Sequence, residues 1–298
     1  MTAGERPSSE SLRFCILGAL EVRPPARRRP VTVRQPLQRA VLATLVLRAG
    51  QLCPRDWLVE ALWGTQGPAD PASTLRTCVY GLRRSLGALG SRLQTGSGGF
   101  LIAAGEAEVD LRLYRALDAR AQVAWDRGDA AAAAWLLAEA LRLWREPALR
   151  DLPCTPLIDG AKARLLAQRA ATEETWLDTQ LALGRHRDLV PRIRALAQQD
   201  PGREHVWAQL MLALYRCGDT AGAMRAYAAA QDALLAEYGV GAGPELAEMR
   251  RCIIAGSARW STAGPWRAAV IIMAPHAALR WAKSARTLMS LVDCLGTG

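Results

Sequence analysis

A long stretch rich in alanine, leucine and arginine, from Leu111 to Ile254, limits most strongly what this chain can fold into. It has few strand-forming residues, and its apolar residues recur at helical spacing between short breaks. Two of these breaks, LGRHRDLV and YRCGDTAG, place Gly184 and Gly218 34 residues apart. A similar break, WDRGDAAAAA around Gly128, precedes them. The stretch therefore predicts an all-helical domain built from repeated helix pairs.

The 34-residue interval is the period of tetratricopeptide repeats. Counted from the two glycines, Pro201 falls where such a repeat ends a helix. The large and small packing positions of the repeat fall on Trp207, Leu210, Ala223, Tyr227 and Ala230. Because each helix pair buries its apolar face only against its neighbours, we expect at least three pairs and a docking surface for a partner. A structural solenoid without a bound partner is the alternative.

The first third of the chain changes from strand-like to helical periodicity. Residues 12–33 alternate loosely around the basic segment RPPARRRP and predict short strands joined by a turn. Pro36 is suited to the first position of a helix that ends at Gly50. A second helix is predicted from Pro54 to Gly64, where the glycine supplies a left-handed turn.

A third helix is predicted from Pro71, with Asp70 as its N-terminal cap. One face carries an apolar stripe formed by Leu75, Val79, Leu82, Leu86 and Leu89. The opposite face has no acid and contains Arg76, Thr77, Tyr80, Gly81 and Arg84, with Arg83 at the flank. The segment RLQTGSGGFLIAA then alternates around a glycine-rich turn, which predicts a hairpin. Two helices, the second basic on its outer face, followed by a hairpin indicate a winged helix-turn-helix.

Positive charge is concentrated near the N-terminus. Of the net charge of +10, residues 12–105 supply +9, with 13 arginines and four acids, whereas residues 106–256 carry −2. A one-signed helix face fits a polyanion, and we expect DNA as the partner. The predicted contacts to bases or the groove are Arg76, Thr77, Tyr80 and Arg84, and the predicted contacts to phosphates are Arg39, Arg83 and Arg92. The alternative is a small domain whose arginines only keep it soluble.

The sequence shows no pattern typical of catalytic, cofactor or metal chemistry. Neither Lys162 nor Lys283 stands in a phosphate-binding GxxxxGK[ST] frame, and the three histidines have no ligand spacing. The seven cysteines form no CxxC pair, as is usual for buried thiols in a reducing cytosol. The N-terminus lacks the apolar core of a signal peptide, and the longest apolar run, at 268–279, is too short to span a bilayer. We expect a cytoplasmic protein without cofactor, metal or membrane span, and not an enzyme.

The order of several motifs resembles the SARP family, the antibiotic regulatory proteins of actinomycetes. In the first third these motifs are LGALEV, QRAVLATLVLRAG, LVEALWG, STLRTCVYGLRRSLG and GGFLI. In the helical stretch, LLAEALRLWREPAL, ALGRHRDLV and LMLALYRCGDTAGAMRAY resemble the bacterial transcriptional activation domain of that family. The resemblance covers about residues 12–256.

This resemblance implies a pathway-specific activator of a secondary-metabolite gene cluster, with an OmpR-type winged helix. It implies binding to direct repeats in double-stranded promoter DNA near the −35 element, as a homodimer on DNA. It also implies that the activation domain engages RNA polymerase through sigma factor and alpha subunit regions. We expect no receiver domain before the winged helix and therefore no switching by phosphorylation.

Four positions depart from the pattern of the SARP family. The family commonly has Lys where Leu37 stands, an aromatic residue or His at Cys78, Arg or Asn at Gly81, and Arg at Gly96. Each change removes a possible contact to phosphate or base, which leaves weakened binding and altered specificity both open. Gly81 also lowers helix propensity by about 1 kcal/mol relative to Ala, a cost that close approach to DNA would explain.

We expect a mainly α protein in which an N-terminal α+β winged helix-turn-helix precedes an all-α tetratricopeptide-like repeat domain. The expected parts are a disordered N-terminus at 1–11, the winged helix at 12–105, the activation domain at 106–256 and a tail at 257–298. In the tail, the predicted amphipathic helix has its apolar stripe at Ala278, Trp281, Ala282, Ala285, Leu288, Met289 and Val292.

Other functions stay open at this point. A helical-repeat interaction protein with a weakened DNA-binding domain predicts little salt-dependent affinity for DNA. A repressor of the same architecture predicts DNA binding with lowered transcription. An enzyme is the weakest alternative, because no constellation of residues supports it.

Overall fold

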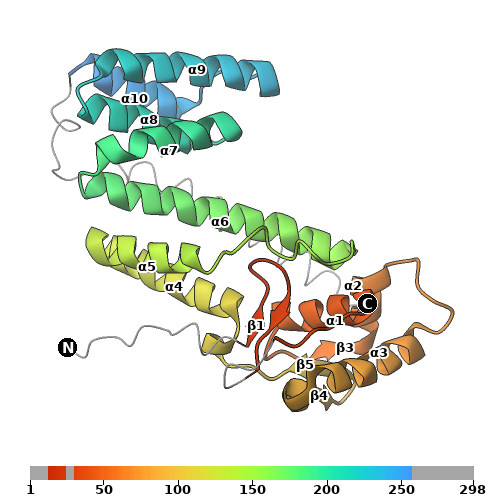
Figure 1. Ribbon diagram of the computed structural model, residues 1–298. Coiled ribbons are helices and arrows are strands. Elements are labelled where there is room, and N and C mark those ends of the chain that lie inside the picture. Colours follow the sequence, from red (N-terminus) through yellow and green to blue (C-terminus); the bar gives the residue numbers. More distant parts are fainter. Residues whose placement is uncertain (1–12, 25–29, 257–298) are drawn as a thin grey trace, which may run out of the picture. The chain divides into compact units, whose positions relative to one another are not determined.

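The computed structural model describes residues 13–24 and 30–256, which form two compact units. The first unit contains the chain up to Val123 together with Trp135–Glu173, and the second contains Ala124–Ala134 together with the chain from Glu174. The predicted disordered N-terminus and the predicted amphipathic helix of the tail lie outside the described residues. Figure 1 labels most of the helices and strands of the two units.

The first unit contains two small antiparallel sheets. Strands β1 (Phe14–Cys15) and β2 (Glu21–Val22) pair with Phe14 opposite Val22. The second sheet has the order β3-β5-β4, with β3 (Cys53–Pro54) and β4 (Leu93–Gly96) on either side of β5 (Gly99–Ile102). The predicted strands near the N-terminus and the predicted hairpin are therefore confirmed.

Three helices lie between these strands, namely α1 (Pro36–Leu47), α2 (Arg55–Trp63) and α3 (Pro71–Leu86). The predicted starts at Pro36 and Pro71 are confirmed, and the Asp70 side chain caps α3 by accepting from the Ser73 N–H at 2.9 Å. The predicted start of the second helix is wrong by one residue, because Pro54 pairs with Gly99 in the sheet.

The apolar stripe of α3 forms much of the core of this winged helix. Leu75, Val79, Leu82 and Leu86 are all buried. After α3, a 3-10 turn (Gly87–Arg92) leads directly into β4, so the hairpin follows the helix without a long loop. The order of helix, turn, helix and hairpin is that of a winged helix-turn-helix, as the sequence predicts.

The chain then becomes entirely helical. A short 3-10 turn (Glu106–Glu108) precedes α4 (Asp110–Asp126), α5 (Ala130–Arg142) and α6 (Pro156–Ala182), and each of these three helices has residues in both units. Within the first unit, the Tyr114 ring meets the Trp144 ring edge-on at 5.4 Å, and its hydroxyl lies 2.6 Å from the Thr172 hydroxyl. These contacts join α4 to α6 and to the segment that follows α5.

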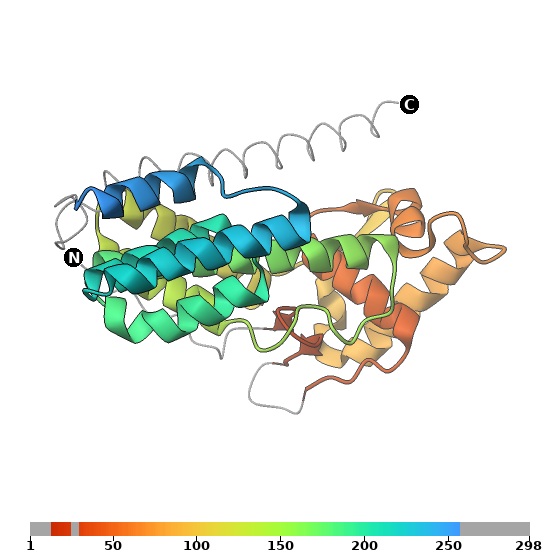
Figure 2. The same cartoon turned by 90° about the horizontal axis from the view of Figure 1, so that it is seen from above.

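The second unit continues with α7 (His186–Gln199), α8 (Glu204–Arg216), α9 (Thr220–Tyr238) and α10 (Pro244–Ile254) (Figure 2). Gly128, Gly184 and Gly218 each lie at a turn between helices, with φ of +83°, +81° and +83°. A positive φ is costly for residues with a Cβ, which explains why glycine recurs at these breaks. The predicted tetratricopeptide-like helix pairs are confirmed.

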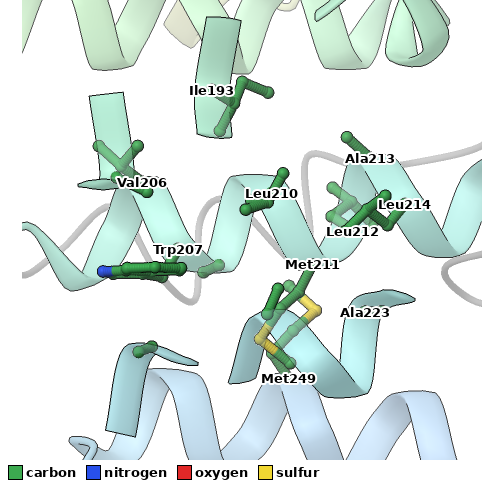
Figure 3. Packing of buried hydrophobic residues seen from close by; sticks show 14 of the residues in the cluster. Ile193, Val206, Trp207, Leu210, Met211, Leu212, Ala213, Leu214, Ala223 and Met249 are labelled. Carbon is green, nitrogen blue, oxygen red and sulfur yellow. The ribbon is translucent and has the colours of Figure 1, made fainter. Parts of the chain in front are cut away.

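The core of the second unit centres on α8, whose residues Val206 to Leu214 are all buried. At the predicted packing positions, Trp207, Leu210, Ala223 and Ala230 are buried and Tyr227 packs against them partly buried. Figure 3 shows Met211 of α8 and Met249 of α10 lying against each other. Each helix therefore buries its apolar face against its neighbours, as in other helical repeats.

Residues 13–24 and 30–256 contain no helix that is both long and apolar enough to cross a bilayer. Nor do the His, Cys, Asp and Glu side chains of these ranges form a group that could hold a metal ion.

Candidate nucleic-acid interface

The outer face of α3 presents a row of exposed polar side chains. Arg76, Thr77, Tyr80 and Arg84 are all exposed, and Tyr80 is 64% exposed although it is a large aromatic residue. The helix contains no Asp or Glu. Within the described part of the chain, neither Arg76 nor Arg84 has an ion-pair or hydrogen-bond partner. Their guanidinium groups are therefore free to meet an anionic ligand.

The β4–β5 hairpin lies beside α3 and is tied to it by Arg83. The Arg83 Nε donates to the Leu93 carbonyl at 2.9 Å, and its Nη2 donates to the Thr95 hydroxyl at 2.6 Å. At the tip of the hairpin, Gly98 has φ of +84°, a conformation that favours glycine. Arg83 thus fixes this hairpin, the wing of the fold, against α3, whose outer face carries Arg76 and Arg84.

A shallow hollow of about 380 Å³ opens at the C-terminal end of α3. It is lined by Tyr80, Arg83, Arg84, Gly87, Gly90, Ser91 and Leu93. The close approach of the 3-10 turn to the helix requires glycine at position 90, because a Cβ there would lie 2.5 Å from the Arg83 carbonyl oxygen. The hollow therefore joins the basic face of α3 to the start of the wing.

The three arginines predicted to contact phosphates all have partners within the protein. Arg39 donates to the Val33 carbonyl at 3.2 Å and forms an ion pair with Asp151. Arg92 donates to the Ala103 carbonyl at 3.3 Å and pairs with Glu108 at 3.1 Å. Arg83 is held by the wing. These three arginines therefore differ from Arg76 and Arg84, which have no partner among the described residues. The phosphate contacts of Arg39, Arg83 and Arg92 stay predictions.

Two of the positions that depart from the SARP pattern have a structural explanation near α1 and α3. Cys78 is buried in the core, 7% exposed, and burial raises the pKa of its thiol to about 11. A Cβ at Gly81 would lie 2.6 Å from the Gln38 Nε2 of α1. The Gln38 side chain is buried, accepts from the Ser85 hydroxyl at 3.2 Å and donates to Gln35. The glycine therefore leaves room for the end of the Gln38 side chain, and its explanation through close approach to DNA stays a prediction.

The other two positions that depart from the SARP pattern, Gly96 and Leu37, also have surroundings within the protein. A Cβ at Gly96 would lie 2.7 Å from the Leu52 Cδ1, so the Leu52 side chain occupies the space beside this wing residue. Leu37 lies partly buried in the first turn of α1. Glycine at positions 81 and 96 thus leaves space that the ends of the Gln38 and Leu52 side chains occupy.

Two further residues near this interface, Arg34 and Gln38, are not among the contacts predicted from the sequence. Arg34 is exposed just before α1 and, among the residues described, has no hydrogen-bond or ion-pair partner. Gln38 connects the start of α1 to the C-terminal half of α3 through Gln35 and Ser85. The only sequence signal for Arg34 is a basic residue next to a proline-initiated helix, which is common on solvated surfaces.

Comparisons with known proteins agree with this architecture. Residues 31–99 match the family described as "Transcriptional regulatory protein, C terminal", and residues 109–254 match the bacterial transcriptional activator domain. Regulatory protein DnrI of Streptomyces peucetius is 34% identical over 225 residues, which cover 72% of this chain and 83% of the relative. The chain belongs to the SARP family. It combines the C-terminal domain of transcriptional regulatory proteins with a bacterial transcriptional activator domain.

Other relatives are longer than this SARP-family chain. Regulatory protein AfsR of Streptomyces griseus is 36% identical over 247 residues, and the chain spans 25% of its length. The solved structure of Mycobacterium tuberculosis EmbR in complex with a low-affinity phosphopeptide superposes with a TM-score of 0.81 at 26% identity. That superposition covers 90% of this chain and 70% of EmbR. AfsR and DnrI are both named as regulatory proteins.

Proposed function

We propose that this SARP-family protein binds double-stranded promoter DNA through α3 and activates transcription of a secondary-metabolite gene cluster. The observation that carries the proposal is the acid-free outer face of α3, on which Arg76 and Arg84 have no partner among residues 13–24 and 30–256. A helix of this width fits the major groove, where an arginine can donate two hydrogen bonds to O6 and N7 of guanine.

The four predicted contact residues of α3 have different roles in this proposal. Arg76 and Arg84 bind guanine edges or the phosphates at the margin of the groove. Thr77 contacts base edges with its hydroxyl or its methyl group, and Tyr80 donates its hydroxyl to the backbone. The wing, held against α3 by Arg83, places its exposed tip residues near the neighbouring phosphates.

The finer features of the function follow from family membership. We propose binding to direct repeats near the −35 element as a homodimer, with contacts from the activator domain to the sigma factor and alpha subunit regions of RNA polymerase. The relatives DnrI and AfsR are named regulatory proteins of Streptomyces, which supports a regulatory role in actinomycete metabolism. The domain plan, a winged helix at 12–105 and an activation domain at 106–256, also stays part of the proposal.

Fluorescence anisotropy with promoter DNA from the genomic neighbourhood, over a salt series, tests DNA binding. We expect specific binding with a steep salt slope, which Arg84→Ala weakens while the melting temperature stays unchanged. Arg194→Ala, which removes an exposed arginine from α7, is the matched control and is expected to bind as the wild type does.

Transcription reconstituted with purified RNA polymerase then tests the direction of regulation. Increased transcript supports an activator, whereas decreased transcript at the same promoter identifies a repressor. Binding no tighter than to random DNA, with no effect of Arg84→Ala, would refute the DNA-binding role and favour a helical-repeat interaction protein.

A further inference from the structure

The loop between β1 and β2, residues 16–20, takes its hydrogen-bond partners from the activator domain (Figure 1). Three of its N–H groups and four of its carbonyl groups are bonded to atoms of Asp110, Arg145, Leu149 and Asp151. All these residues lie in the first compact unit. The loop precedes the matched regulatory domain, residues 31–99, and its backbone is satisfied by residues of the matched activator domain, residues 109–254.

Asp110, the first residue of α4, holds the beginning of this loop. Its carboxylate is 1% exposed and accepts from the N–H groups of Ile16 at 2.8 Å and Leu17 at 2.9 Å. Burial raises the pKa of Asp110 to about 6, although these N–H donors and the Arg145 guanidinium, 3.8 Å away, act in the opposite direction. A buried carboxylate of this kind needs all its partners, so the loop and the start of α4 are fixed together.

The segment after α5 holds the middle of the loop. The Arg145 N–H donates to the Leu17 carbonyl at 3.0 Å, and the Leu149 N–H donates to the Gly18 carbonyl at 2.8 Å. The Arg145 guanidinium donates to the Ala19 carbonyl at 3.2 Å and forms an ion pair with Glu21 of β2. This side chain lies across Gly18, where a Cβ would be 3.3 Å from the Arg145 Cβ. Arg145 thus crosses the whole loop.

Asp151 connects the loop at 16–20 to helix α1. One of its oxygens accepts from the Leu20 N–H at 2.9 Å, and the other forms an ion pair with Arg39 of α1. Because α1 packs against α3, in part through Gln38 and Ser85, a continuous set of contacts leads from the activator domain to the helix with the free arginines.

We propose that Arg145 and Asp151 are positioning residues for transcription activation, which hold the DNA-binding helices and the first activator helices in one fixed orientation. This inference rests on the proposed function. A flexible tether would let the activator surface sample many orientations around a bound promoter, and only a fraction of them would meet RNA polymerase. Four residues, which we call the clamp, prevent these unproductive orientations: Asp110, Arg145, Leu149 and Asp151.

The test compares the full-length variants Arg145→Ala and Asp151→Asn with the wild type. The two readouts are anisotropy with DNA that carries a single repeat and transcription with purified RNA polymerase at saturating protein. We expect affinity for the single repeat to stay within about twofold, while transcription falls at least fivefold. Arg145→Lys, which keeps the backbone contact and the positive charge, is expected to retain at least half of the wild-type transcription. Arg142→Ala, three residues earlier, is the control, because Arg142 is exposed and its one ion pair in the described part of the chain is with Glu139.

Hydrogen exchange of residues 16–20 shows directly whether each variant opens the clamp. Wild-type transcription with faster exchange in this loop would overturn the inference. A loss of single-repeat affinity equal to the loss of transcription would overturn it as well, because Arg145 would then act only through the stability of the winged helix. Asp151→Asn, which changes a partly exposed side chain, keeps the test valid if Arg145→Ala unfolds. Failure of the wild type to bind the promoter contradicts the proposed function instead, and is seen before any variant is made.

Discussion

At the scale of single residues, Arg83 and Arg84 are neighbours with different surroundings. Arg83 donates to Leu93 and Thr95 of the wing, whereas Arg84 is exposed and, in the described structure, has no partner. We expect Arg83→Ala to lower the free energy of unfolding by about 1 kcal/mol, since it removes hydrogen bonds at a partly exposed site. Arg84→Ala should leave stability unchanged and reduce the salt dependence of DNA binding. Urea unfolding and anisotropy separate the two roles, and equal stability losses would contradict the assignment.

Gly81 allows a second test at the same scale, because its missing side chain leaves room for Gln38. Alanine at this helical position should gain about 1 kcal/mol of helix propensity. In the wild-type background we expect most of this gain to be lost, since the new Cβ displaces the buried Gln38 amide. In a Gln38→Ala background the gain should appear in full. A double-mutant cycle by urea unfolding measures the difference, and an energy of interaction near zero would show that Gln38 does not restrict this position.

At the scale of elements, His205 joins three helices of the second unit. Its Nε2 lies 2.9 Å from Asp178 of α6, and its Nδ1 lies 2.7 Å from Glu245 of α10. Burial by itself lowers the pKa of His205, but the two carboxylates outweigh it and raise the pKa well above 6.5. The folded state therefore binds the proton more tightly than the unfolded state does. The stabilisation is complete below about pH 6.5 and is lost as the pH rises through the raised pKa.

The variant His205→Gln tests this pH dependence. We expect it to lower the free energy of unfolding at pH 6 by about 3 kcal/mol, as removal of one partner from a buried ion pair does. The difference from the wild type should shrink as the pH rises from 6 towards 10. Urea unfolding at several pH values measures it, and a difference that does not change with pH would mean that His205 is neutral in the folded protein.

Elements with local signals could be predicted from sequence, whereas their tertiary contacts could not. The cap Asp70, the proline at the start of α3 and the 3.6-residue period correctly placed Arg76, Thr77, Tyr80 and Arg84 on the exposed face. The partners of Arg39 and Arg92, Asp151 and Glu108, lie 112 and 16 residues away along the chain. No periodicity indicates such pairs, so the sequence pattern does not distinguish paired arginines from free ones.

At the scale of the whole molecule, sequence domains and compact units do not coincide. The two family matches meet between residues 99 and 109, but the winged helix shares its compact unit with residues 135–173. The reason is physical: backbone groups of the loop at 16–20 need hydrogen-bond partners when they are buried, and the activator domain provides them. The N-terminal sheet that contains this loop is therefore held by contacts from the matched activator domain.

A comparison of two fragments tests this dependence. A fragment of residues 12–105 lacks the partners of the loop at 16–20, whereas a fragment of residues 12–173 contains them all. Each lost backbone hydrogen bond costs about 0.5–1.5 kcal/mol, so the loss of several should destabilise the shorter fragment by roughly 4 kcal/mol or more. We expect it to melt well below the longer fragment by circular dichroism, with fast hydrogen exchange at Ile16 and Leu17. Equal melting temperatures would show that the winged helix folds without the activator helices, and that the contacts with Asp110 and Arg145 orient the domain without stabilising it.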